Sequence, residues 1–125
     1  MTRILIVDDD KDMLDLLSFN LIEEGYEVSV ARNGLEALNH ARMTLPDLVL
    51  LDVRLDDLDG YTVCEMLRAL PSTSAIPILF LTGMHGTNAR IRGMRAGASD
   101  YLTKPFRTSH VVRRVREILP TTWAC

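Results

Sequence analysis

Short runs of valine, isoleucine and leucine alternate along the chain with longer segments in which apolar residues recur every three or four positions. The runs around Ile4, Leu48 and Ile78 are apolar at consecutive positions and do not alternate with polar residues. Continuous runs of this kind are typical of parallel strands that are covered on both faces. The predicted strands are Arg3 to Val7, Glu27 to Ala31, Leu48 to Asp52, Pro77 to Thr82 and Asp100 to Thr103.

The segments between these runs have the spacing of amphipathic helices. In the first of them, Leu14, Leu17 and Leu21 share one face. Asp10 is placed to cap the start of this helix, and Gly25 is placed to end it. Strict alternation of strand and helix predicts a doubly wound α/β fold, in which helices cover both faces of one five-stranded parallel sheet. The five predicted helices are Lys11 to Glu24, about Gly34 to Met43, Tyr61 to Leu70, about Thr87 to Ala96 and Arg107 to Leu119.

Length and composition narrow the class of protein. The chain has 125 residues, of which 47% are hydrophobic and 25% charged, as expected for a single globular domain. Two cysteines do not make a disulfide framework, and no apolar stretch is long enough for a membrane span or a signal peptide. We therefore expect a cytoplasmic protein without a membrane partner. Residues 120–125 follow the last predicted helix and are expected to form a short tail or a truncated linker.

Charge is unevenly distributed along the sequence. The formal net charge is -3, which disfavours nucleic acid as a direct ligand. Up to Glu65 the chain carries 5 basic and 15 acidic side chains, whereas the remainder carries 9 basic and 2 acidic ones. This asymmetry suggests two faces with different partners.

Polar side chains follow four of the predicted strands at their carboxyl ends, the edge at which open parallel sheets bind ligands. Three of them are carboxylates, and their mutual repulsion favours a hard divalent cation such as Mg²⁺. An aspartate beside Mg²⁺ can attack phosphorus when an ammonium group helps to neutralise the transferring group. These residues are Asp8 and Asp9 after the first strand, Asp52 at the end of the third, Thr82 at the end of the fourth and Lys104 after the fifth.

These residues lie in four motifs whose order resembles that of the receiver domains of two-component response regulators. The resemblance covers Arg3 to about Leu119 and implies a receiver domain over residues 1–119, with the flavodoxin-like strand order 2-1-3-4-5. The motifs are Ile4 to Asp10, Pro46 to Asp52 with Asp59 and Gly60 downstream, Leu81 with Thr82, and Gly97 to Phe106.

The resemblance also implies roles for the residues of the first two motifs. Asp52 would accept a phosphoryl group from a sensor histidine kinase or a phosphotransfer protein. Mg²⁺ would be the cofactor, with Asp9 as a direct ligand and Asp8 acting partly through water. Asp52 and the backbone carbonyl of Arg54 would complete the protein ligands.

The residues of the third and fourth motifs would act on the phosphoryl group or respond to it. Thr82 would bond to the group, and Lys104 would pair with it. A cis peptide bond is implied before Pro105. Tyr101 matches the aromatic switch position and, because it lies on a buried strand, is equally expected in the core.

The implied protein is a signalling switch and not a classical enzyme, although it would catalyse its own phosphorylation and dephosphorylation. Its output would act through helix 4, strand 5 and helix 5 on an unidentified partner. The resemblance leaves open whether phosphorylation also produces a homodimer. Two alternatives remain: an aspartyl-nucleophile phosphohydrolase, which would need an acid where Arg54 stands, and a phosphate-independent interaction module. Asp56 replaces a proline that is common in the family, which predicts a looser and more acidic loop after Asp52.

Overall fold

The fold is a doubly wound α/β domain built on one parallel sheet. The computed structural model describes residues 1–119, so the predicted tail lies outside the described residues. Within this range five parallel strands are arranged in the order β2-β1-β3-β4-β5, which confirms the predicted topology. The strands are β1 Arg3–Val7, β2 Glu27–Ala31, β3 Leu48–Leu51, β4 Ile78–Thr82 and β5 Asp100–Thr103.

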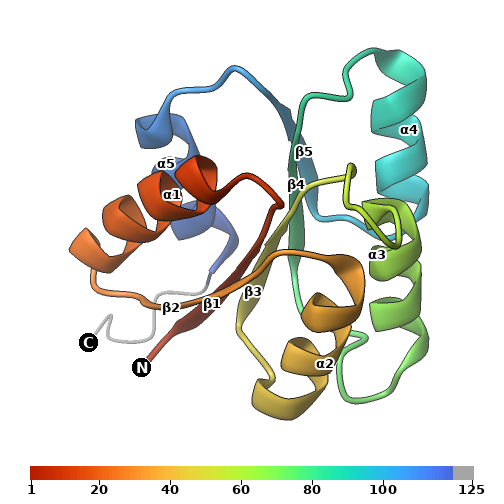
Figure 1. Cartoon of the computed structure of the whole chain (residues 1–125), viewed down its shortest axis with the longest axis horizontal. Coiled ribbons are helices and arrows are strands. Elements are labelled where there is room, and N and C mark those ends of the chain that lie inside the picture. The colour runs from red at the N-terminus through yellow and green to blue at the C-terminus, as the bar shows by residue number, and fades with distance from the viewer. Residues whose placement is uncertain (120–125) are drawn as a thin grey trace.

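Five helices of the described range lie in two layers. Helices α1 and α5 cover one face of the sheet, and α2, α3 and α4 cover the other (Figure 1). No helix among residues 1–119 has the length and apolar character that a membrane crossing requires. The helices are α1 Lys11–Glu23, α2 Gly34–Thr44, α3 Gly60–Ala69, α4 Thr87–Arg95 and α5 Thr108–Ile118.

The strands alternate their buried side chains between two apolar clusters, one in each layer. In β4, Phe80 packs into the cluster under α2, α3 and α4, whereas Leu79 and Leu81 pack into the cluster under α1 and α5. Successive strand residues point to opposite faces, so a strand covered on both sides is apolar throughout. This explains why the three central runs of the sequence are continuous.

Helix ends follow local signals in the sequence. Asp10 caps α1, and its carboxylate accepts hydrogen bonds from the backbone N–H groups of Asp12 and Met13. The chain leaves this helix through Gly25, whose φ of +94° is in the left-handed region that glycine adopts at little cost. The predicted bounds differ from the observed ones by one residue or less, because caps and glycines, and not only the apolar stripe, set the ends of helices.

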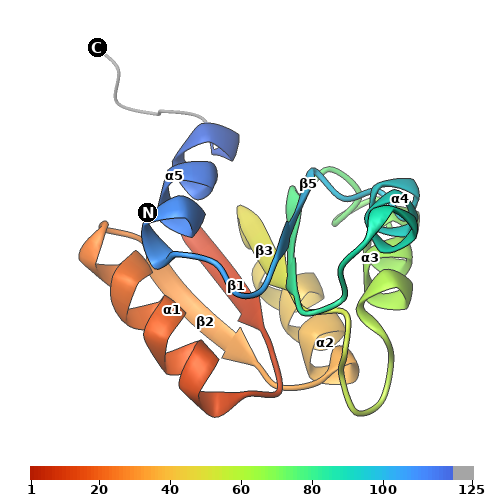
Figure 2. The same cartoon turned by 90° about the horizontal axis from the view of Figure 1, so that it is seen from above.

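The strand register brings the site residues together. Val7 pairs with Leu51, so the next residue of each chain segment, Asp8 and Asp52, leaves the sheet at the same level. The backbone N–H of Asp52 donates to the carbonyl of Val7 at 3.0 Å, which continues the ladder by one step. The loops that follow β1, β3, β4 and β5 therefore gather at one edge of the sheet, and Figure 2 shows the arrangement from above.

Candidate functional site

Three aspartates form an acidic cluster at the carboxyl edge of the sheet. Asp8, Asp9 and Asp52 each offer a carboxylate oxygen, and these oxygens lie within 4.8 Å of one another. Asp8 and Asp52 are buried, whereas Asp9 is exposed. The cluster is therefore a half-enclosed set of oxygen ligands that is open to solvent on the side of Asp9.

Lys104 connects the buried members of this cluster. Its ammonium Nζ donates to Asp8 Oδ2 at 2.8 Å and to Asp52 Oδ2 at 3.1 Å. Its backbone N–H donates to the carbonyl of Thr82 at 2.8 Å, and the peptide bond between Lys104 and Pro105 is cis. One ammonium group thus faces two carboxylates that come from strands far apart in the sequence.

The electrostatics of the cluster follow from burial and from this shared ammonium group. Burial raises the pKa of Asp8 above the ordinary carboxyl value; the bond from Lys104 opposes this effect in part, and the charge of Asp52 adds to it. Burial alone would lower the pKa of Lys104, but its bond to Asp8 and the charge of Asp52 raise it overall. With three ionised carboxylates and one ammonium group, the cluster has an excess of negative charge.

Replacing Asp8 by Asn should raise the free energy of unfolding of the metal-free chain at pH 7. A carboxyl whose pKa is raised by folding destabilises the folded state as pH increases from its ordinary value of 3.8 through the raised value. The gain should vanish below pH 3.8, where Asp8 is protonated in both states, and should shrink or reverse in Mg²⁺. Thermal unfolding in EDTA and in Mg²⁺ measures both effects, and lower stability of Asp8→Asn in EDTA would contradict this account.

A hydroxyl and a loop border the cluster on the side of β4. Thr82 is fully buried, and its Oγ1 accepts a hydrogen bond from the backbone N–H of Met84 at 3.2 Å. The Arg54 side chain reaches this loop, where its Nε lies 3.2 Å from Met84 Sδ. The sequence pattern did not predict this contact, which joins the two loops beside Asp52.

Three aromatic side chains, Tyr61, Phe80 and Tyr101, pack together next to the loop that follows Thr82. Tyr101 is 2% exposed, and its hydroxyl donates to the carbonyl of Met84 at 2.6 Å and lies 3.2 Å from the hydroxyl of Tyr61. Phe80 packs between the two tyrosine rings, with centroid separations of 5.5 and 5.6 Å. Tyr101 therefore occupies an inward position in which its hydroxyl contacts the loop after Thr82. Tyr61 has no counterpart among the sequence predictions, because only the tertiary structure brings it to Tyr101.

The loop after Asp52 is held at both ends. The backbone N–H of Arg54 donates to Asp52 Oδ1 at 3.3 Å, and the N–H of Gly60 donates to the carbonyl of Val53 at 2.7 Å. The carboxylate of Asp57 bonds the loop to the start of α2. The loop predicted to be loose is thus tied to its neighbours, because Asp57 supplies contacts that the missing proline would not.

The chemistry of this donor set fits Mg²⁺. Three carboxylates converge without a second cation beside Lys104 in the described part of the chain, and hard oxygen donors are the ligands that Mg²⁺ prefers. Asp8, Asp9 and Asp52 would hold the ion. Burial raises the pKa of Asp8 and the charge of Asp52 raises it further, and a bound divalent cation would favour the ionised carboxylate against both effects.

Fold and site together define a receiver domain, the class in which a parallel five-stranded sheet presents an acidic cluster, a hydroxyl and a lysine at one edge. The sequence model of the response regulator receiver domain matches residues 4–116, and the chain belongs to this family. The family binds Mg²⁺ through acidic residues and is generally distinct from classical enzymes.

Two curated relatives and one solved structure illustrate the relationship. The DNA-binding dual master transcriptional regulator RpaA of Synechocystis sp. is 44% identical over 98% of this chain. Response regulator PleD of Caulobacter vibrioides is 45% identical over 93% of it. The chain spans 51% of the first relative and 26% of the second. Chemotaxis protein CheY4 of Vibrio cholerae superposes with a TM-score of 0.90 at 29% identity, covering 95% of this chain and 99% of that one.

Proposed function

We propose that the chain is a cytoplasmic phosphoacceptor switch in which Asp52 receives a phosphoryl group from a histidine kinase. The observation that carries the proposal is the convergence of Asp8, Asp9 and Asp52 around the Lys104 ammonium group. Response regulator relatives imply histidine kinases as donors and output domains as targets. The unit that would do this is the domain of residues 1–119.

The proposed reaction uses few groups of the protein. A carboxylate oxygen of Asp52 attacks phosphorus of the donor phosphohistidine; a P–O bond forms, the P–N bond breaks, and the imidazole leaves with the electron pair. Lys104 neutralises part of the charge on the transferring group, and the hydroxyl of Thr82 donates a hydrogen bond to a phosphoryl oxygen. Asp8, Asp9, Asp52 and the backbone carbonyl of Arg54 would hold Mg²⁺, which would neutralise more of this charge when bound. Attack of water on phosphorus then breaks the P–O bond to Asp52; inorganic phosphate leaves with the oxygen and protons of the water, and the Asp52 carboxylate is restored.

Labelling with acetyl phosphate tests this proposal directly. With Mg²⁺ present, the chain should incorporate up to one equivalent of phosphate, and hydroxylamine should release it because an acyl phosphate reacts with nucleophiles. EDTA should prevent the incorporation. Stable, hydroxylamine-resistant labelling, or no labelling at all, would contradict the proposal.

The two alternatives have less support. A phosphohydrolase of the aspartyl type would need a carboxylic acid two residues after the nucleophile, and that residue is Arg54, whose guanidinium contacts Met84. A phosphate-independent module would not require three carboxylates to be kept together at a cost in repulsion.

The signal would reach the surface through Thr82 and Tyr101. The inward position of the Tyr101 ring depends on Gly93 of α4, because a Cβ atom on this glycine would lie 2.7 Å from the ring carbon Cδ2 of Tyr101. The guanidinium of Arg92 lies over the neighbouring Tyr61 ring, 4.5 Å from its centroid. The position of α4 and that of the Tyr101 ring are therefore linked by direct contact.

Replacing Gly93 by Ala should push the Tyr101 ring outward and cost about 1–3 kcal/mol of stability through overpacking. The chain has three tyrosines, so fluorotyrosine labelling gives three ¹⁹F resonances, and that of Tyr101 should move toward a solvent-exposed shift. Asn88→Ala changes an exposed residue of the same helix and should leave the resonance in place. An unchanged Tyr101 resonance in the Gly93 variant would show that the contact does not set the position of the ring.

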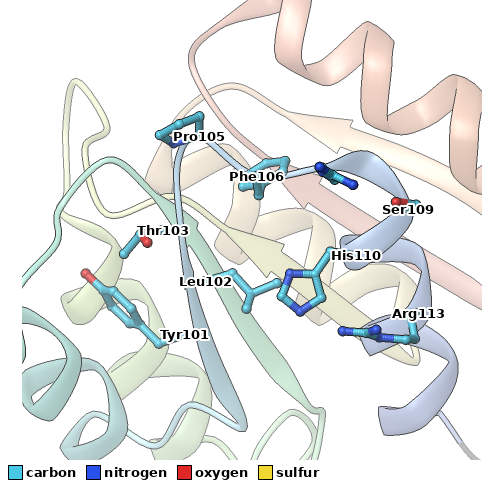
Figure 3. Close-up of a pocket in the computed structure, with 9 residues that line it drawn as sticks. Tyr101, Leu102, Thr103, Pro105, Phe106, Ser109, His110 and Arg113 are labelled. Atoms are coloured by element: carbon cyan, nitrogen blue, oxygen red, sulfur yellow. The ribbon is translucent and has the colours of Figure 1, made fainter.

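The proposed output surface contains a groove between β5 and α5. Its volume is about 770 Å³, and Leu102 of β5 and His110 and Arg113 of α5 line it (Figure 3). Arg107 and Arg113 are exposed and make no ion pair with the described residues. We propose that this surface binds an acidic protein partner.

Several arginines among the 9 basic residues after Glu65 are paired with carboxylates in the structure. Asp100 accepts from Arg90 of α4 at 3.3 Å and from Arg114 of α5 at 2.8 Å, so one carboxylate pairs with two of these arginines. Arg116 pairs with Glu24 of the segment after α1. These arginines hold helices and strands together, and only part of the basic excess is left for a partner.

A further inference from the structure

Asp57 joins the loop after β3 to the start of α2. Its Oδ1 accepts from the backbone N–H of Gly34 at 2.7 Å, and its Oδ2 accepts from that of Leu35 at 2.9 Å. The N–H of Leu58 also donates to Oδ1, at 2.7 Å. The first N–H groups of a helix lack partners within the helix, so one carboxylate satisfies two of them and faces the positive end of the helix dipole.

This contact is not simply the cap of α2. Asn33 already caps the helix, with its side chain accepting from the N–H of Glu36 at 2.9 Å. The bonds from Leu35 and Gly34 lower the pKa of Asp57, so its carboxylate is ionised at neutral pH. The contact with Asp57 therefore also restrains its other partner, the loop that follows β3.

The same loop carries Arg54, whose backbone carbonyl is the fourth proposed metal ligand. Arg54 lies beside the acidic cluster, with its N–H 3.3 Å from Asp52 Oδ1. Among residues 1–119, Asp57 is the only side chain of the loop that is hydrogen-bonded to α2. Without it, the segment between Arg54 and the cap of α3 at Asp59 would have no polar anchor on α2.

We propose that Asp57 is a positioning residue for the magnesium site: it holds the loop against α2 and thereby keeps the Arg54 backbone in place beside Asp52. Asp57 itself does not contact the ion. The inference rests on the proposed function, because it concerns how that site is preorganised. Groups that orient metal ligands typically change metal affinity by about 10–100-fold when they are removed.

Magnesium titration of two alanine variants tests the inference. Asp56 is exposed and makes no hydrogen bond or ion pair with the described residues, so Asp56→Ala removes the same charge from the same loop without breaking the contact. By isothermal titration calorimetry at pH 7, Asp57→Ala should raise the Mg²⁺ dissociation constant about tenfold. Asp56→Ala should raise it by less than about twofold, as expected for an exposed charge.

Backbone amide exchange gives a readout that does not depend on the metal. In EDTA, the amides of Gly34 and Leu35 should exchange faster in Asp57→Ala than in Asp56→Ala. Asp57→Asn keeps one acceptor oxygen, so its Mg²⁺ dissociation constant and its amide exchange rates should lie between those of Asp57→Ala and the parent chain. This variant replaces Asp57→Ala in both measurements if the alanine variant does not fold. Equal Mg²⁺ affinities for the Asp56 and Asp57 variants would overturn the positioning role. A parent chain that binds no Mg²⁺ would overturn the proposed function.

Discussion

Replacing Asp52 by Asn is expected to reduce phosphate incorporation from acetyl phosphate to about 1% of the parent level or less. The carboxamide has nearly the shape of the carboxylate but lacks the anionic oxygen that attacks phosphorus. Lys104 keeps its 2.8 Å bond to Asp8, so the variant should fold. Radiolabelling with acetyl phosphate in Mg²⁺ measures the loss, and circular dichroism checks the fold.

A matched control distinguishes loss of the Asp52 nucleophile from loss of negative charge anywhere in this loop. Asp56→Asn removes a charge four residues away, on the exposed surface of the loop, and should be labelled like the parent chain. Undiminished labelling of Asp52→Asn would place the acceptor elsewhere and would remove the central residue of the proposed mechanism.

Replacing Gly60 by Ala should destabilise the chain by roughly 3–5 kcal/mol, a large part of the stability of a small domain. A Cβ atom at this position would lie 2.2 Å from the backbone oxygen of Asp52 and 2.8 Å from the Cα of Val53. Both neighbours are backbone at the end of β3, so the clash is relieved only if α3 moves away from the strand. Phosphate incorporation at Asp52 should fall as well, because the same movement displaces the acceptor.

Urea unfolding measures this loss, and Gly83→Ala is the control. A Cβ atom at Gly83 meets nothing within 4 Å, and its φ is outside the left-handed region, so Gly83→Ala should change stability by less than about 1 kcal/mol. If Gly60→Ala unfolded at the same urea concentration as the parent chain, α3 would not pack against β3 as closely as the structure shows.

The sequence predicted the fold because its signals are local. Continuous apolar runs mark the central strands, and caps and glycines mark the helix ends. The positions of Asp8, Asp52, Thr82 and Lys104 followed from a single topological rule, that polar residues after parallel strands meet at one edge. That rule predicts proximity but not which groups pair.

The contacts that sequence reasoning missed depend on the packing of separate helices. Lys104 bonds to Asp8 more closely than to Asp52, although Asp8 is 96 residues away. Asp57 reads as one more exposed acid until α2 is placed beside it. In the sequence Tyr61 marks only the start of a predicted helix, and the contact of its hydroxyl with Tyr101 depends on how β5 is placed beside α3. Each of these pairs is set by the sheet order and helix placement, which local patterns do not encode.

The two apolar clusters of the sheet have a consequence for how a signal spreads. The three contacting aromatic residues Tyr61, Phe80 and Tyr101 all belong to the cluster beneath α2, α3 and α4. Helix α1 packs through Leu17 and Leu21 into the opposite cluster, together with α5. The sheet thus separates two packed layers, and we expect a change in the position of Tyr101 to affect α4 by direct contact and α1 only through the sheet. We therefore expect a partner bound to α1 to be less sensitive to the proposed switch than one that contacts α4 or β5, the strand that carries Tyr101.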